Sequence, residues 1–201
     1  MNSESIPEYK IILASNSSIR QKILEDSGIP FEVVPSEVEE EELKQSLSGN
    51  NFREFCLTLA KAKALDVSNK KKNAYVIGSD QICSYGEEIF SKPLTKENCF
   101  KTLSKLSGNT HYQNCGISIC KNGKEIWSHY AQAALTMKSL SDGEIRDYID
   151  KDEPFMACGA YRFESLGKNL FLTTKGDETT IQGLTLNPII NFLTSKKVIN
   201  L

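Results

Sequence analysis

The chain has 201 residues, of which 39% are hydrophobic and 25% are charged, and its formal net charge is −2. This ordinary globular mixture predicts a folded core and excludes a disordered chain. The charge balance gives no overall positive field for a nucleic-acid backbone, so we expect no nucleic-acid partner. The N-terminus carries Glu4 and Glu8 without a long apolar run, so we expect no signal peptide. No run of about 18 apolar residues occurs, so we expect no membrane partner, and we predict a cytoplasmic protein.

The first half of the sequence alternates strands and helices. Apolar runs predict buried strands at 11–14, 31–34 and 75–80. Helical spacing of apolar residues predicts helices from 19 to Gly28, from about 52 to 67, and from about 95 to 106. An acidic run at 37–42 precedes the second helix.

The second half begins with a predicted hairpin. Asn122-Gly123 is a strong turn signal between apolar segments at 112–120 and 125–137. Ser141 and Glu144 then stand at the spacing of a capping box, which predicts the start of a short helix.

Near the C-terminus, Asn187 and Pro188 suit the N-cap and first position of a last helix. Helices and strands alternate early in the chain, and antiparallel strands dominate later. We therefore predict an α/β fold with a mixed twisted sheet flanked by helices.

The cysteines and histidines point to no catalytic or metal site. Six cysteines are spread along the chain without a Cys-x-x-Cys pair, which indicates reduced, mostly buried thiols. His111 and His129 fall in predicted strands with no acidic or serine partner nearby in sequence, which favours structural or surface roles.

The strand, loop and helix start at 13–20 form a candidate anion site. Unpaired N–H groups and the positive end of the helix dipole favour a phosphate there. Ser15 would add a hydroxyl donor, and Arg20 a forked cation. The alternative is that the serines only cap the helix and that Arg20 is a surface charge.

Asp80 is the candidate catalytic carboxylate. It follows an apolar strand and should lie at the carboxyl edge of the sheet, where ligands bind in open α/β folds. It would hold a divalent metal, activate water, or do both. An aspartate in a simple turn is the alternative.

Glu40, Lys63 and Lys92 are candidates for a site that handles polyphosphate. Such a site needs carboxylates for Mg²⁺ and cations for the charge of the leaving pyrophosphate. The alternative for each of these residues is a charged side chain on a solvated face. A Walker P-loop is absent from the sequence, which excludes an ATPase of that type.

Taken in order, many short segments resemble the Maf family of nucleotide pyrophosphatases. They include Leu-Ala-Ser-Asn-Ser-Ser-Ile-Arg at 13–20 and Ile-Gly-Ser-Asp-Gln at 77–81. Further matches lie at 29–33, 37–40, 59–64, 92–94, 106–111, 159–161 and 183–186.

The resemblance implies a single Maf-like domain over 1–201, with residues 1–8 as a flexible N-terminal extension. It also implies an elongated, two-lobed fold of the Maf and ITPase type with the site in a central cleft, and a homodimer.

The resemblance also implies an activity and residue roles. A nucleoside triphosphate would be cut to its monophosphate and pyrophosphate. Asp80 would be the general base acting with a divalent cation (Mg, Mn or Co), which Glu40 would help to hold. The matching phosphate-binding positions are Arg20, Lys63 and Lys92.

Substrate choice is expected to depend on a few positions near the base. Gln81 and Glu164 resemble the branch acting on 7-methyl-GTP, and a carboxylate suits a cationic methylated guanine. Ile19 stands where that branch usually has an aromatic residue, and Gln21 where the family commonly has a second arginine. A dTTP/UTP pyrophosphatase and a non-catalytic nucleotide-binding regulator of cell division remain alternatives.

Overall fold

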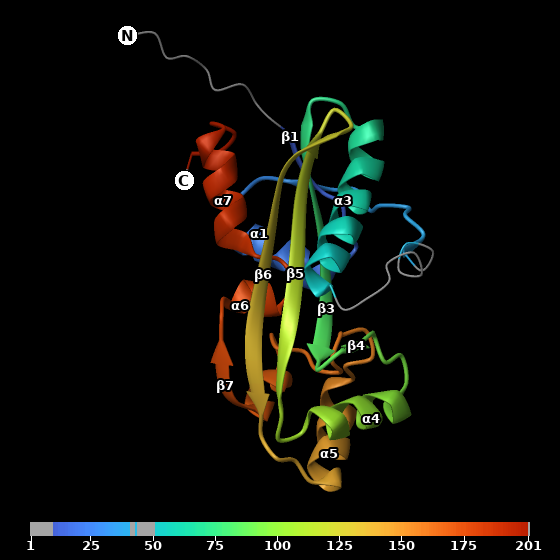
Figure 1. Ribbon diagram of the computed structural model, residues 1–201. Coiled ribbons are helices and arrows are strands. Elements are labelled where there is room, and N and C mark those ends of the chain that lie inside the picture. Colours follow the sequence, from blue (N-terminus) through green and yellow to red (C-terminus); the bar gives the residue numbers. More distant parts are fainter. Residues whose placement is uncertain (1–9, 41–42, 44–50, 201) are drawn as a thin grey trace.

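The computed structural model describes residues 10–40, 43 and 51–200. The predicted N-terminal extension and residues 41 and 42 of the acidic run lie outside these residues. Within them, a seven-stranded mixed sheet runs along the length of an elongated molecule, in the order β2-β1-β3-β5-β6-β7, with β4 also beside β3 (Figure 1).

The strands are β1 (Lys10–Leu13), β2 (Glu32–Val33), β3 (Ala74–Tyr85), β4 (Glu88–Phe90), β5 (Thr110–Lys121), β6 (Lys124–Met137) and β7 (Phe171–Lys175). The helices are α1 (Ser18–Asp26), α3 (Phe52–Lys70), α4 (Lys96–Leu106), α5 (Asp142–Asp152), α6 (Glu178–Ile181) and α7 (Leu186–Ser195), with a 3-10 helix η1 (Leu166–Leu170). β1 is parallel to β2 and to β3, and the other pairings are antiparallel. The predicted mixed sheet flanked by helices is confirmed.

Two local signals in the sequence act as predicted. Asn122 and Gly123 both have positive φ angles, 52° and 76°, which is the backbone of the favoured two-residue hairpin turn between β5 and β6. Ser141 accepts a hydrogen bond from the Glu144 backbone N–H, and the Glu144 carboxylate accepts one from the Ser141 N–H at 2.8 Å. The capping box therefore starts α5.

The predicted start of the last helix is wrong by two residues. α7 begins at Leu186, and Thr185 rather than Asn187 is its N-cap. Pro188 still lies in the first turn, where its missing N–H removes no helical hydrogen bond.

Hydrophobic cores lie toward both ends of the sheet. One is built around α1, α7 and the first half of β3, and it contains Tyr75 and Ile77. Another lies around α4 and α5 and contains Cys83. β3 passes from one core to the other, and Ser79, Asp80 and Gln81 form a polar stretch between them.

α3 packs directly on the middle of the sheet because two strand residues lack side chains. A Cβ atom on Gly78 would lie 2.1 Å from the Ala60 carbonyl oxygen, and one on Gly116 would lie 2.5 Å from the Cys56 carbonyl carbon. Only glycine at these positions lets the helix backbone come so close to β3 and β5.

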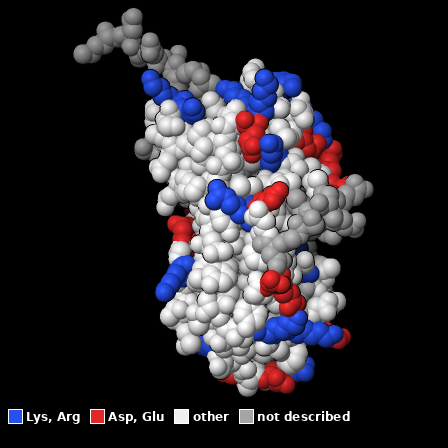
Figure 2. Space-filling view, in the orientation of Figure 1, with Lys and Arg blue, Asp and Glu red and all other residues white. Residues whose placement is uncertain are grey.

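Charged side chains of both signs are scattered over the face in Figure 2, in small groups rather than in one continuous area. An anionic ligand on this face would therefore depend on individually placed cations. None of the described helices combines the length and apolar character needed to cross a bilayer.

Candidate active site at the open edge of β3

One edge of β3 is uncovered in its middle. β1 ends at Leu13, which pairs with Ile77, and β4 begins to pair at Cys83. Between these points, residues 78–82 pair with β5 alone among the described strands. We call this stretch the open edge of β3. Asp80 lies in the middle of the strand, so its predicted place at a strand end is wrong; it is the neighbouring strands that stop there.

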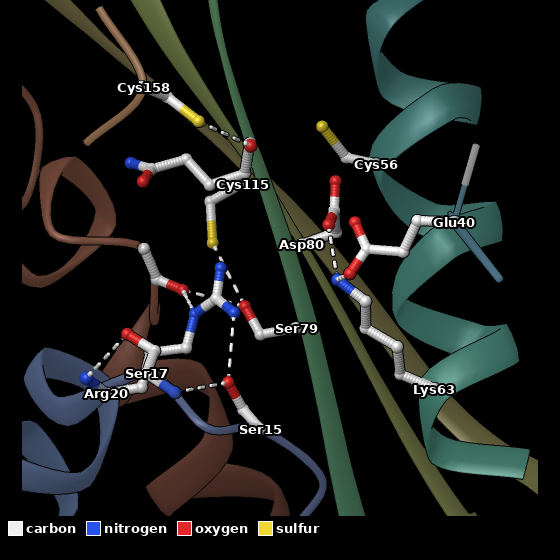
Figure 3. Close-up of polar contacts among 12 residues, drawn as sticks. Ser15, Ser17, Arg20, Glu40, Cys56, Lys63, Ser79, Asp80, Cys115 and Cys158 are labelled. Carbon is white, nitrogen blue, oxygen red and sulfur yellow. Dashed lines mark hydrogen bonds and ion pairs between the residues drawn. The ribbon is translucent and has the colours of Figure 1, made fainter. Parts of the chain in front are cut away.

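Asp80, Lys63 and Glu40 form one cluster beside the open edge. The Lys63 Nζ atom lies 2.7 Å from Asp80 Oδ1 and 2.9 Å from Glu40 Oε1 (Figure 3). Lys63 and Asp80 are only 7% and 6% exposed. The close packing of α3 on Gly78 explains the contact, because Lys63 lies one turn beyond Ala60 on the same helix.

Arg20 and the start of α1 form a second polar group. The Arg20 Nε donates to the Gly183 carbonyl at 2.8 Å, and Nη1 lies 3.2 Å from Ser15 Oγ. Ser79 Oγ donates to the same Gly183 carbonyl at 2.7 Å. Ser17 caps α1 by accepting from the Arg20 backbone N–H. Arg20 has no ion pair with any described residue, so its charge is available to an anion.

The two groups lie on either side of β3 (Figure 3). Side chains alternate along a strand, so Ser79 and Gln81 face α6 and the Arg20 group, whereas Asp80 faces α3. The open edge lies between the two sides. A ligand crossing it would meet Arg20 on one side and Lys63 on the other.

Not every predicted site residue joins these groups. Lys92 is exposed, and it makes no hydrogen bond or ion pair within the part of the chain that the structure describes. It follows β4 by two residues, and β4 runs antiparallel to β3, so the chain returns toward the level of Asp80.

Ile19 and Glu164 line the same hollow, which has a volume of about 290 Å³. It lies between α1, η1 and α6, and its lining residues are Ile19, Lys22, Ile23, Asp26, Phe163, Glu164, Ser165, Lys168, Glu178 and Gln182. Arg20 and Gly183 do not line the hollow, but each directly follows a residue that does, Ile19 and Gln182 respectively.

Gln81 does not line this hollow. Its side-chain amide donates to the carbonyls of Thr180 and Ile181, at 3.1 and 2.6 Å. The residue therefore fastens α6 to β3 next to Asp80.

A divalent cation is compatible with the cluster. No group of three or more His, Cys, Asp or Glu side chains suited to a metal occurs in residues 10–40, 43 and 51–200. Glu40 and Asp80 nevertheless present two carboxylates close together through Lys63. Mg²⁺ is commonly held by one or two carboxylates together with substrate phosphates and water, so this donor set fits.

Two cysteines border the site without the properties of a nucleophile. Burial raises the pKa of Cys56, beside Asp80, and the pKa of Cys115, beside Ser79. Both thiols therefore stay protonated at neutral pH. None of the six cysteines, all of which lie in the described residues, forms a disulfide, and five of them are buried.

Sequence reasoning missed the roles of Ser79 and the Gly183 carbonyl. A signal for Ser79 existed, because it is a polar residue next to Asp80 in a buried strand. Nothing in the sequence indicates that the carbonyl of residue 183 would meet Arg20, because that contact joins segments 163 residues apart.

The chain belongs to the Maf-like proteins, because the model of that family matches residues 10–196. Among its relatives is the nucleoside triphosphate pyrophosphatase of Legionella pneumophila (strain Corby), which is 40% identical over 99% of this chain and 100% of the relative. Another is the 7-methyl-GTP pyrophosphatase of Brucella abortus biovar 1 (strain 9-941), which is 38% identical over 95% of this chain and 98% of the relative.

A solved structure is also similar. The Staphylococcus aureus Ham1 protein aligns with a TM-score of 0.50 and 16% identity, covering 93% of this chain and 99% of that one. At this identity the likeness concerns the fold alone, and it confirms the fold class expected from the sequence.

Proposed function

We propose that this protein is a nucleoside triphosphate pyrophosphatase that converts its substrate to a monophosphate and pyrophosphate. The observation that carries the proposal is the buried Asp80–Lys63 pair, with Glu40, at the open edge of β3 and across that edge from Arg20. The names of the Legionella and Brucella relatives support the same reaction.

Asp80 is the proposed general base. A water oxygen attacks the α-phosphorus, its proton passes to the Asp80 carboxylate, and the bond from the α-phosphorus to the bridging oxygen breaks, so that pyrophosphate leaves with that oxygen. Lys63 orients the carboxylate through its 2.7 Å contact. Proton transfer to a positioned base typically contributes about 100- to 10,000-fold to such a rate.

The remaining cations are proposed to hold the phosphates. Ser15, Arg20 and the first N–H groups of α1 offer donors to the β- and γ-phosphates. Lys63 would neutralise part of the phosphate charge from the opposite side of β3. Lys92 would reach the phosphates from the segment after β4.

A divalent cation (Mg, Mn or Co) is part of the proposal, and Glu40 and Asp80 are the residues that would hold it. It would neutralise phosphate charge and favour attack by water. The cluster offers only these two carboxylates, so phosphate oxygens of the substrate and water would supply the remaining ligands.

We propose 7-methyl-GTP as the substrate. Glu164 places a carboxylate at the hollow beside Arg20, which suits the positive ring of 7-methylguanine, and Ile19 provides an apolar wall. Gln81 would act on specificity indirectly, by fixing α6 at the side of the hollow.

A nucleotide panel tests the proposal. The purified protein is given 7-methyl-GTP, GTP, dTTP and UTP with Mg²⁺, Mn²⁺ or Co²⁺, and the products are separated. We expect monophosphate and pyrophosphate in equal amounts, fastest from 7-methyl-GTP, and lost selectivity over GTP in Glu164→Gln. Release of diphosphate and orthophosphate, or no reaction with any nucleotide, would contradict the proposal.

We further propose that the protein works in the cytoplasm as a homodimer, each chain forming one Maf-like domain. Light scattering on the purified protein would test the assembly, and a single-chain mass at all concentrations would exclude the dimer.

A further inference from the structure

A buried carboxylate outside the proposed catalytic cluster fastens the loop that carries Glu164. Asp152, the last residue of α5, is 4% exposed. Its Oδ2 accepts from the Tyr148 hydroxyl at 2.8 Å, and its Oδ1 accepts from the Ser165 hydroxyl at 2.6 Å. A buried carboxylate is unfavourable without such partners, so this one needs both α5 and the loop in place.

Tyr148 connects the same two elements. Burial raises the pKa of Tyr148, so its hydroxyl stays protonated and donates to Asp152. Its oxygen also accepts from the Arg162 backbone N–H at 2.9 Å. Arg162, at the start of the turn 162–165 that carries Glu164, is thus fixed to α5, the helix that holds Asp152.

We call the contacts of Asp152 with Tyr148 and Ser165 the anchor. Arg162 joins the anchor to Glu164. Its Nη1 lies 3.8 Å from Asp152 Oδ1 and donates to the Asp152 carbonyl at 3.3 Å, while its Nε donates to Glu164 Oε1 at 3.4 Å. The loop then closes on itself, because the N–H groups of Ser165 and Gly167 both donate to the Arg162 carbonyl. Glu164 is held between two fixed residues.

We propose that Asp152 is a positioning residue for substrate selectivity. It acts through Ser165 and Arg162 to hold the Glu164 carboxylate at the hollow beside Arg20. This inference rests on the proposed function and adds to it a residue that does not itself line the hollow. Removing the anchor leaves Glu164 present and mobile, so it discriminates less between a cationic and a neutral guanine.

The test compares the kcat/KM ratio for 7-methyl-GTP over GTP among single variants. Ser165→Ala removes one hydroxyl from the anchor, and Asp152→Asn removes its charge. The matched controls are Ser195→Ala, which loses a comparable hydrogen bond to Phe192 in α7, and Asp150→Asn, which loses an exposed ion pair on α5. Thermal unfolding and circular dichroism identify variants that fail to fold. If Asp152→Asn does not fold, the kcat/KM ratio of Ser165→Ala still tests the proposal.

We expect the ratio to fall about tenfold in Ser165→Ala and in Asp152→Asn, because small displacements of a positioned group have large effects. The ratio should stay unchanged in both controls. Ser165→Thr should keep the wild-type ratio, because threonine retains the hydroxyl that donates to Asp152. In a Glu164→Gln background, Ser165→Ala should change the ratio no further. Binding of the two nucleotides to the same variants in an Asp80→Asn background, measured by calorimetry, provides the same comparison without turnover.

The outcomes separate the two proposals. If Glu164→Gln lowers the ratio and the anchor variants do not, the anchor is refuted and the proposed substrate stands. If Glu164→Gln leaves both hydrolysis and binding ratios unchanged, the substrate assignment and the anchor both fail. An additive loss in the double variant would also refute the anchor, since the effect of Ser165 would then bypass Glu164.

Discussion

Replacing Lys63 by methionine should destabilise the protein through the charges it leaves behind. The substitution keeps an unbranched side chain of similar length but removes the cation shared by Asp80 and Glu40. Breaking a buried pair by removing one partner costs about 3–5 kcal/mol. We expect the lower end, about 3 kcal/mol, because the Glu40 side chain is 40% exposed and can turn to water. For a chain of this size that loss lowers Tm by roughly 6–12 °C.

Urea unfolding followed by circular dichroism at pH 7.5 measures the change. The double variant Lys63→Met with Asp80→Asn should recover part of the loss, because no charged aspartate then remains buried without a partner. If Lys63→Met unfolds within about 1 kcal/mol of the wild type, or if the double variant is less stable than the single one, the pairing is not the reason that Asp80 is tolerated in the sheet.

Three further substitutions test other parts of the structure. Gly78→Ala should lower the free energy of unfolding in urea by about 3 kcal/mol, because the added methyl would lie 2.1 Å from the Ala60 carbonyl oxygen. Gly143→Ala is the control and should be tolerated, because a Cβ atom there meets nothing within 4 Å. Equal stabilities of the two variants would contradict the close packing of α3 on Gly78. Arg20→Lys keeps the charge but loses the forked donors, so kcat/KM should fall roughly 100-fold, and an unchanged value would remove Arg20 from phosphate binding. Burial lowers the pKa of His111 from 6.5 to about 4. Between these pH values the imidazole is protonated in the unfolded chain but not in the folded protein. The free energy of unfolding should therefore fall by about 3 kcal/mol as the pH drops from 6.5 to 4. His111→Gln should flatten that part of the stability curve, and curves of equal slope would exclude His111 as the cause.

Local signals in the sequence were sufficient for much of the fold. The Asn122-Gly123 turn and the Ser141 capping box each depend on a few neighbouring residues, and both are present as predicted. The start of α7 was misplaced because Asn187 and Pro188 satisfy the same local rules two residues too late. Such shifts at helix ends are common where several residues suit the cap.

The site was harder to predict, because its geometry depends on where other strands stop. Asp80 was expected at a strand end, yet β3 continues to Tyr85, and the gap between β1 and β4 creates the open edge. The Lys63 contact requires α3 to pack on Gly78, which no local pattern reveals. The resemblance to a family supplied the candidate residues, and their arrangement could come only from the three-dimensional structure.

The central claim is that Asp80, held by Lys63 at the open edge of β3, is the base for attack on the α-phosphate. It is tested most directly by the rate of pyrophosphate release from 7-methyl-GTP by the wild type and by Asp80→Asn at saturating Mg²⁺. The amide keeps the shape of the side chain but cannot take the proton, so we predict a fall in kcat of roughly 1000-fold with nucleotide binding largely retained. A variant that releases pyrophosphate at the wild-type rate would contradict the account.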